Sequence, residues 1–213
     1  MYFFSKLFNF VLLASSKYNI DESHDITHSM NVLHFANEIY EAELPKNPRL
    51  YENQKIIYTA AVLHDMCDKK YMDERDGISD IAKYIGTDFY SYEVDAISSI
   101  IGTMSYSKVK KSGFPKLGPY QDAYHIVREA DLLAAYDFDR CMIYDLEQKG
   151  SNIIMAYQNA HDLFETRIFK HNDDKLFVHD YAKQKSLELE SIALQRITAW
   201  RKILCSARST FIK

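Results

Sequence analysis

Glycine and proline, the residues that most often interrupt regular secondary structure, are scarce in this chain of 213 residues. Only 6 Gly and 4 Pro occur. They gather mainly at Pro45–Pro48, at Gly77 and Gly86, and within the sequence KKSGFPKLGP at 110–119. The segments between these positions are therefore long and uninterrupted, and their apolar periodicity indicates what each of them forms.

Apolar residues recur at helical spacing through these segments. After Ser23, which is able to act as an N-cap, a helix is predicted from about 24 to 43. Its predicted stripe consists of Ile26, Met30, Leu33, Asn37 and Tyr40, widened by Val32, Phe35 and Ile39. The same spacing predicts helices over about 50–66, 89–103, 120–148, 153–170 and 176–204. No sustained apolar and polar alternation indicates a strand, so the predicted fold class is all-α.

The first residues, MYFFSKLFNFVLLASSKY, resemble a signal peptide in one respect, because an apolar run precedes small residues. Their basic region is a single Lys6, however, and four apolar residues fall at helical spacing: Phe4, Phe8, Val11 and Leu12. A first core helix is therefore the favoured interpretation.

The composition limits the class of protein. Hydrophobic residues make up 47% and charged residues 26% of the chain, which is typical of a soluble globular protein without a membrane partner. No segment approaches the ~20 apolar residues that span a bilayer. A net charge of -4 argues against a general binder of nucleic-acid polymers. Cys67, Cys141 and Cys205 form no CxxC pair and indicate reduced thiols, hence a cytoplasmic protein. The length of 213 residues predicts a single domain over 1–213.

Three polar clusters interrupt otherwise apolar helical sequence. AAVLHDMCDKK at 60–70 places His64 and Asp65 directly after an apolar run. A lone His-Asp pair is usually a buried histidine capped by its neighbour. SHDITHSMNV, however, adds His24 and His28 one turn apart, a spacing that suits shared ligation or a ligand with a hydrogen-bonding partner. IVREADLLAAYD adds Asp131 within apolar helix, where a carboxylate is costly to bury without a cation or donor.

Two histidines and two aspartates form a mixed nitrogen and oxygen donor set. Such a set suits Mn, Fe, Zn or Mg better than calcium, which prefers oxygen alone, or a structural zinc, which favours cysteine. The sequence therefore predicts a divalent metal site made by side chains far apart along the chain.

The motifs HDITH, VLHDMCDKK and READLLAAYD, in this order, resemble the HD-domain superfamily of metal-dependent phosphohydrolases. The likeness is to small stand-alone members with the motifs HDxxHxxRV and HDxxDxK and a helix carrying a late Asp. It implies a compact helical bundle with a central metal site, a motif-bearing core over about 22–140 and C-terminal helices over about 150–205 packing on it. It also implies the metal ligands His28, His64, Asp65 and Asp131, a catalytic acid Asp68, and the substrate-binding residues Lys70 and, in the SYSK loop, Lys108.

Two departures from these motifs bear on substrate and metal. Asn31 stands where the subgroup usually has an arginine, the natural clamp for phosphate, and Arg128, Lys70 and Lys108 are alternative cations. Between His64 and Asp131 the only histidine is His125, so the further histidines of binuclear relatives are missing. One divalent ion is therefore expected, and the choice among Mn, Fe, Co, Ni, Zn and Mg stays open.

The resemblance implies a metal-dependent phosphohydrolase that acts on a small phosphorylated substrate, most often a nucleotide. A guanosine tetraphosphate hydrolase is an alternative, although Cys67 replaces the Glu of the HDxxED motif of those enzymes. A non-catalytic metal- or nucleotide-binding module is another, because Asn31 replaces the arginine clamp. The oligomeric state is left open, with a homodimer among the alternatives.

Overall fold

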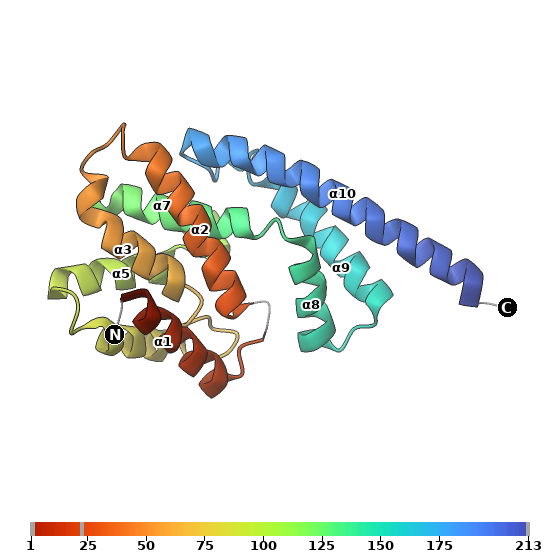
Figure 1. Cartoon of the computed structure of the whole chain (residues 1–213), viewed down its shortest axis with the longest axis horizontal. Helices are drawn as coiled ribbons and strands as arrows, with labels where there is room; N and C mark the ends of the chain where they lie inside the picture. Colours follow the sequence, from red (N-terminus) through yellow and green to blue (C-terminus); the bar gives the residue numbers. More distant parts are fainter. Residues whose placement is uncertain (1–2, 22–23, 212–213) are drawn as a thin grey trace. The chain divides into compact units, whose positions relative to one another are not determined.

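The computed structural model describes residues 3–21 and 24–211 (Figure 1). The chain is 76% helical, with 10 α-helices and no strand in the part described. The predicted all-α fold class is therefore confirmed. Within the described residues, no helix combines the length and the apolar character needed to cross a membrane.

The chain divides into two compact units, Met1–Ala134 and Ala135–Lys213. The first contains α1 (Phe3–Tyr18), α2 (Ile26–Glu43), α3 (Leu50–Leu63), α4 (Glu74–Ile85), α5 (Ser91–Thr103), α6 (Tyr106–Ser112), the 3-10 helix η2 (Gly118–Tyr120) and α7 (Gln121–Ala134). The second contains α8 (Phe138–Lys149), α9 (Ile153–Thr166), η3 (Ile168–Lys170) and α10 (Asp180–Phe211). The predicted packing of C-terminal helices on the motif-bearing core stays a prediction.

Three helices of the first unit, α2, α3 and α7, pack against one another and form the centre of that unit (Figure 1). Their contacts include small side chains that are fully buried, among them Ala36 in α2, Ala60 in α3 and Ala130 in α7. Small residues at a contact allow two helix axes to approach closely. This close approach brings polar side chains of the three helices within contact distance of one another.

Several helix boundaries differ from those predicted. The predicted helix over 120–148 is wrong, since α7 ends at Ala134 and α8 begins at Phe138. Asp137 caps α8 by accepting a hydrogen bond from the backbone N–H of Arg140 at 3.1 Å. Helices α4 and α6 were not predicted. Asp73 caps α4 through the N–H groups of Arg75 and Asp76.

The buried faces of α1 and α2 also differ from the predicted stripes. In α1 the buried residues are Leu7, Val11 and Ala14, whereas Phe4 and Leu12 are exposed. In α2 the buried face includes His28 and Ser29, and Met30 is 50% exposed. The predicted N-cap Ser23 lies outside the described residues; Asp25 caps α2 by accepting from Thr27 N–H at 2.8 Å.

The second unit has its own small core and a polar tie between helices. Phe138 of α8 meets Tyr157 and Phe164 of α9 in edge-to-face contacts. Asp139 of α8 accepts hydrogen bonds from Arg196 and Trp200 of α10. Aromatic packing and a shared carboxylate therefore join the three helices of this unit.

Candidate metal centre

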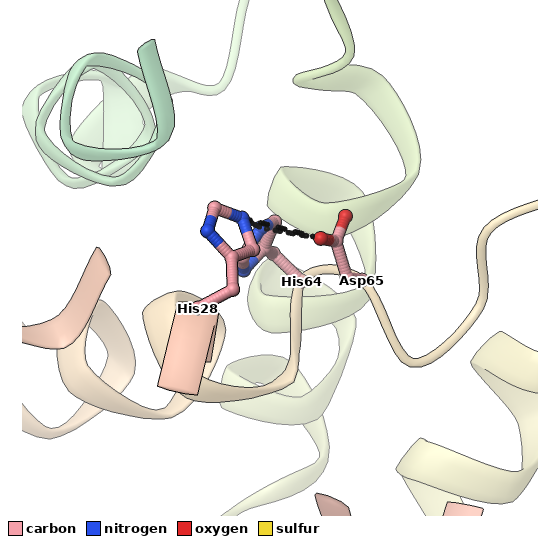
Figure 2. Close-up of side chains that lie close together, drawn as sticks. All are labelled: His28, His64 and Asp65. Atoms are coloured by element: carbon pink, nitrogen blue, oxygen red, sulfur yellow. Dashed lines mark hydrogen bonds and ion pairs between the residues drawn. The ribbon is translucent and has the colours of Figure 1, made fainter. Parts of the chain in front are cut away.

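Four side chains from three helices meet at the centre of the first unit. His28 lies in the first turn of α2, and Asp131 lies near the end of α7. His64 is the C-cap residue of α3, and Asp65 follows it where the helix gives way to turns (Figure 2). Because α3 ends here, two adjacent residues turn toward one point, which neighbours inside a helix cannot do.

Each histidine Nε2 atom lies at nearly the same distance from the other histidine and from one oxygen of each aspartate. The Nε2 atom of His28 lies 3.2 Å from His64 Nε2, 3.3 Å from Asp65 Oδ2 and 3.4 Å from Asp131 Oδ1. His64 Nε2 lies 3.3 Å from Asp65 Oδ2 and 3.5 Å from Asp131 Oδ1. Four ligands about 2.0–2.1 Å from a tetrahedral centre are separated by about 3.3–3.4 Å. The separations that involve the two histidines therefore fit one divalent cation.

The orientation of His64 is fixed on the side away from the cluster. Its Nδ1 atom lies 2.9 Å from the backbone carbonyl oxygen of Ala61, which only accepts hydrogen bonds. Nδ1 therefore carries the proton and donates it, so in the neutral ring Nε2 presents its lone pair to the cluster. Metal-binding histidines commonly have such a partner, which sets both tautomer and ring angle.

The cluster is strongly polarised in the absence of a cation. Burial would lower the pKa of His64, but the charge of Asp65 and hydrogen bonds with Asp131 and Asp65 raise that pKa well above its ordinary value. Burial would raise the pKa of Asp65, but the charge of His64 and hydrogen bonds from both histidines hold it well below the usual range. Asp131 is shifted in the same direction by the same two histidines. Two ionised carboxylates thus hold a proton on a buried imidazole.

One buried atom of the cluster points to a missing positive partner. Oδ2 of Asp65 is buried, and apart from the two Nε2 atoms at 3.3 Å it has no hydrogen-bond partner among the described residues. A buried carboxylate oxygen with so little compensation is costly, and a cation at the centre of the cluster would remove that cost. His28, His64 and Asp65 together satisfy the distances of a metal-binding group, whereas Asp131 lies near both histidines but outside that mutually close set and stays a predicted fourth ligand. The residues present therefore fit the metal that the sequence predicts.

Accessibility increases from the histidines toward the carboxylates. The side chains of His28 and His64 are 1% and 2% exposed, whereas Asp131 is 29% exposed. Solvent and ligands therefore reach the cluster from the side of the aspartates.

Asp68 and Lys70 lie in the turns that follow α3, and they contact each other. Oδ1 of Asp68 accepts the backbone N–H of Lys70 at 2.8 Å, and Oδ2 lies 3.7 Å from its ammonium. The prediction placed Asp68 one helical turn beyond His64, but the helix does not continue that far. The catalytic role of Asp68 and the substrate-binding role of Lys70 stay predictions.

Two other predicted cations have partners away from the four ligands. The ammonium of Lys108 donates to Glu74 and to the carbonyl oxygen of Gly102, so its predicted substrate contact stays a prediction. Arg128 is buried, donates to Glu129 at 3.2 Å and lies over the ring of Phe114 at 4.6 Å. Both cations are thus paired with groups other than the four candidate ligands.

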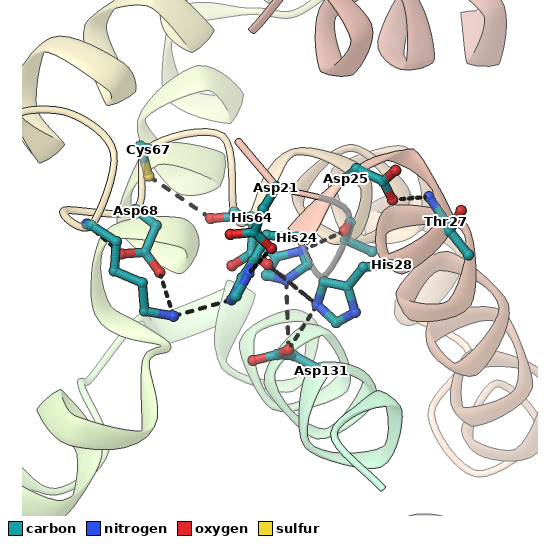
Figure 3. A network of polar contacts seen from close by, with 12 residues as sticks. Asp21, His24, Asp25, Thr27, His28, His64, Cys67, Asp68 and Asp131 are labelled. Atoms are coloured by element: carbon teal, nitrogen blue, oxygen red, sulfur yellow. Dashed lines mark hydrogen bonds and ion pairs between the residues drawn. The ribbon is translucent and has the colours of Figure 1, made fainter. Parts of the chain in front are cut away.

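A polar network beside the cluster was not predicted in full (Figure 3). His24 was expected to lie near His28, and their ring centroids are 6.2 Å apart. Its Nε2 lies 3.1 Å from the ammonium of Lys70, and its Nδ1 lies 3.1 Å from the hydroxyl of Tyr71. Tyr71 in turn donates to Asp21. The sequence signal for the contacts of His24 is the position of Lys70 and Tyr71 shortly after the HDxxD motif.

The fold and the site define an all-α protein with a two-histidine, two-aspartate cluster. No model of a known protein family matches the sequence, and no curated protein matches it. The chain is similar in fold to a crystal structure of a Lactobacillus plantarum protein determined as a structural genomics target. The TM-score is 0.69 over 95% of this chain and 96% of that chain. With 18% sequence identity, this likeness shows the fold alone.

Proposed function

We propose that this chain is a metal-dependent phosphohydrolase of the HD-domain type that acts on a small phosphorylated molecule. A nucleotide is the leading candidate for this substrate. The observation that carries the proposal is that the two histidine Nε2 atoms lie 3.2–3.5 Å from each other and from an oxygen of Asp65 and of Asp131. The order of the motifs along the chain supports the same assignment.

The charges of the cluster suit a phosphate ester. A divalent cation held by His28, His64, Asp65 and Asp131 supplies Lewis acidity and makes a bound water more acidic. Two carboxylates balance its charge, so the negative charge of the substrate must be met by other groups. The ammonium of Lys70 is suited to this, because its side chain is 43% exposed and lies in the turn that follows Asp65. Asp68, beside Lys70, is proposed to hold the proton of the attacking water.

The alternative activity on guanosine tetraphosphate receives less support. Relatives of that kind carry a Glu at the position of Cys67. Burial raises the pKa of the Cys67 thiol to about 12, so this side chain is neutral and cannot act as a carboxylate. We therefore keep this activity only as one member of the substrate panel.

A non-catalytic metal-binding module is the second candidate, and one observation favours it. Oδ1 of Asp68 is already engaged by the backbone N–H of Lys70, which reduces its availability as a base. Asn31, at the position of the usual arginine, is exposed on α2. A protein of this kind would bind the metal and a phosphate ester without turnover.

A phosphate-release assay separates these candidates. The purified chain is supplied in turn with Mn, Co, Ni, Mg, Fe and Zn and is offered nucleoside mono-, di- and triphosphates, guanosine tetraphosphate and sugar phosphates. We expect release of phosphate or pyrophosphate from at least one class, and loss of release in His64→Ala. His34→Ala, on the exposed face of α2, is the matched control and should behave as wild type. Bound metal without release from any substrate would favour the module.

A further inference from the structure

We infer that His24 is a positioning residue: through a directed hydrogen-bond chain that ends at Asp21, it holds the ammonium of Lys70 where the phosphate group of the substrate binds. This inference rests on the proposed function, because it assigns a phosphate-binding role to Lys70. It goes beyond that function by naming the group that aims the cation.

The direction of the chain follows from its far end. A carboxylate only accepts hydrogen bonds, so the contact between Tyr71 and Asp21 uses the hydroxyl proton of Tyr71. The oxygen of Tyr71 must then accept in its 3.1 Å contact with Nδ1 of His24. Nδ1 of His24 therefore carries the proton. Asp21 Oδ1, 3.7 Å from the same nitrogen, favours the same placement.

The tautomer of His24 decides what it offers to Lys70. With the proton on Nδ1, Nε2 of the neutral ring presents a lone pair, and it lies 3.1 Å from the Lys70 ammonium. An ammonium has donors and no acceptor, so only this tautomer makes the contact favourable. The chain thus runs in one direction, from Lys70 through His24 and Tyr71 to Asp21.

The exposure of the side chains along this hydrogen-bond chain suits a role in positioning the Lys70 ammonium. The side chains of Asp21 and His24 are enclosed, whereas that of Lys70 is accessible. The fixed end lies inside the protein, and the charged end lies toward solvent. A lysine side chain is long and flexible, so holding its ammonium before substrate binds lowers the entropic cost of the contact. Asp68, 3.7 Å from the same ammonium, restrains it from a second side.

The hydrogen-bond chain from Lys70 to Asp21 also lies next to the candidate metal ligands. This proximity is why we assign Lys70 to the substrate. The ring of His24 contacts that of His28 one turn along the chain (Figure 3). Lys70 and Asp65 belong to the same run of turns after α3. We therefore assign Lys70 to a phosphate oxygen of a substrate bound at the cation.

Binding of inorganic phosphate to the metal-loaded protein, measured by isothermal titration calorimetry, tests this inference without turnover. Lys70→Met and His24→Leu should each weaken phosphate binding by about tenfold or more, the range for losing a supporting partner. The double variant should be no weaker than Lys70→Met, because His24 acts through Lys70. His24→Gln, which keeps an acceptor near the position of Nε2, should stay within about threefold of wild type.

Matched controls and a direct observation complete the experiment. Lys69→Met removes a neighbouring positive charge and His34→Leu removes an exposed histidine of α2, and neither should change phosphate binding. Metal content should be unchanged in every variant. Nitrogen-15 NMR of the metal-free protein should show the proton of His24 on Nδ1.

Each contrary outcome overturns the inference. These outcomes are absence of saturable phosphate binding by wild type, additive effects of the His24 and Lys70 changes, loss of metal in His24→Leu, and a proton on Nε2 of His24. Failure of the proposed function is a separate result, because phosphate binding with the expected mutant cycle and no hydrolysis of any ester refutes turnover and leaves the positioning role intact.

Discussion

Gly77, in the first turn of α4, lies against the turn that carries two of the candidate ligands. A Cβ atom built on Gly77 would lie 2.6 Å from Cβ and 2.7 Å from Cα of Cys67, and 2.9 Å from the sulfur of Met72. Cys67 follows Asp65 by two residues. Gly77→Ala therefore perturbs the candidate metal site through backbone packing, although position 77 carries no polar group.

The size of the effect follows from the overlap. Ordinary contact begins at 3.4 Å, so the Cys67 backbone and α4 must separate by about 0.8 Å. Alanine gains about 0.5–1 kcal/mol over glycine inside a helix. Overpacking of a filled site costs about 1–3 kcal/mol. All three contacts are shorter than 3.0 Å, so the upper part of this range, about 2–3 kcal/mol, applies. We expect a net loss of about 1–2.5 kcal/mol, equivalent to a fall in Tm of about 2–10 °C for a chain of this size. A ligand shift of this order should also weaken metal binding by about tenfold or more.

Thermal unfolding and metal titration measure the two effects. Gly102→Ala is the matched control, because the added Cβ would meet only the flexible end of Ile78, at 3.3 Å. This control should keep wild-type metal affinity and melt within about 1 °C of wild type or above it. A Gly77→Ala protein with unchanged Tm and unchanged metal affinity would refute the packing argument.

Four further predictions concern the cluster and the residues predicted to act with it. Purified protein should hold about one divalent ion per chain, and His64→Ala or Asp131→Ala should abolish binding and lower Tm; a metal content near two by elemental analysis contradicts the single site. If Asp68 is the base that we propose, Asp68→Asn should keep metal and fold yet lower kcat about 10²–10⁴-fold with KM little changed. Wild-type turnover would assign Asp68 only to the turn with Lys70. Lys108→Met should leave phosphate affinity unchanged but lower Tm, because its ammonium binds Glu74 and Gly102; weaker phosphate binding would return it to the substrate site. The pKa of His64 is raised in the metal-free protein, so its contribution to stability is complete below the ordinary imidazole range and is lost as pH rises through the folded pKa. Metal binding near pH 7 should accordingly release about one proton, which calorimetry in buffers of different ionisation enthalpy measures. Metal binding without proton release would contradict a protonated His64.

The sequence predicted the fold class from local periodicity, and the resemblance of its motifs to a known family associated four side chains that lie far apart along the chain. Helical periodicity identifies helices without any tertiary information, and motif order associates His28 with His64, Asp65 and Asp131. The structure places these four side chains together. Their role as metal ligands stays a prediction, and the metal titrations test it.

Errors arose where polar groups decide the structure. In α2 the predicted stripe counted apolar residues and placed Met30 inside, but His28 and Ser29 occupy the buried face. Helix α4 was missed because Gly77 was taken as an interruption, although Ile81 and Ile85 keep helical spacing and Asp73 caps the helix. Contacts such as Lys108 with Glu74 depend on how separate helices pack, and single-sequence periodicity carries no information about that packing.

The convergence of α2, α3 and α7 on one point has a further consequence for the lifetime of the folded chain. His28 and His64 are 36 positions apart in sequence, and Asp131 lies farther along. Under the proposed occupancy, one cation would close these stretches into loops, as a disulfide does, but reversibly and without an oxidant. At a free metal concentration about 100 times Kd, the stabilisation would reach about 2.7 kcal/mol. The amount of intact protein in a cell would then follow the supply of metal, independently of whether any substrate is present.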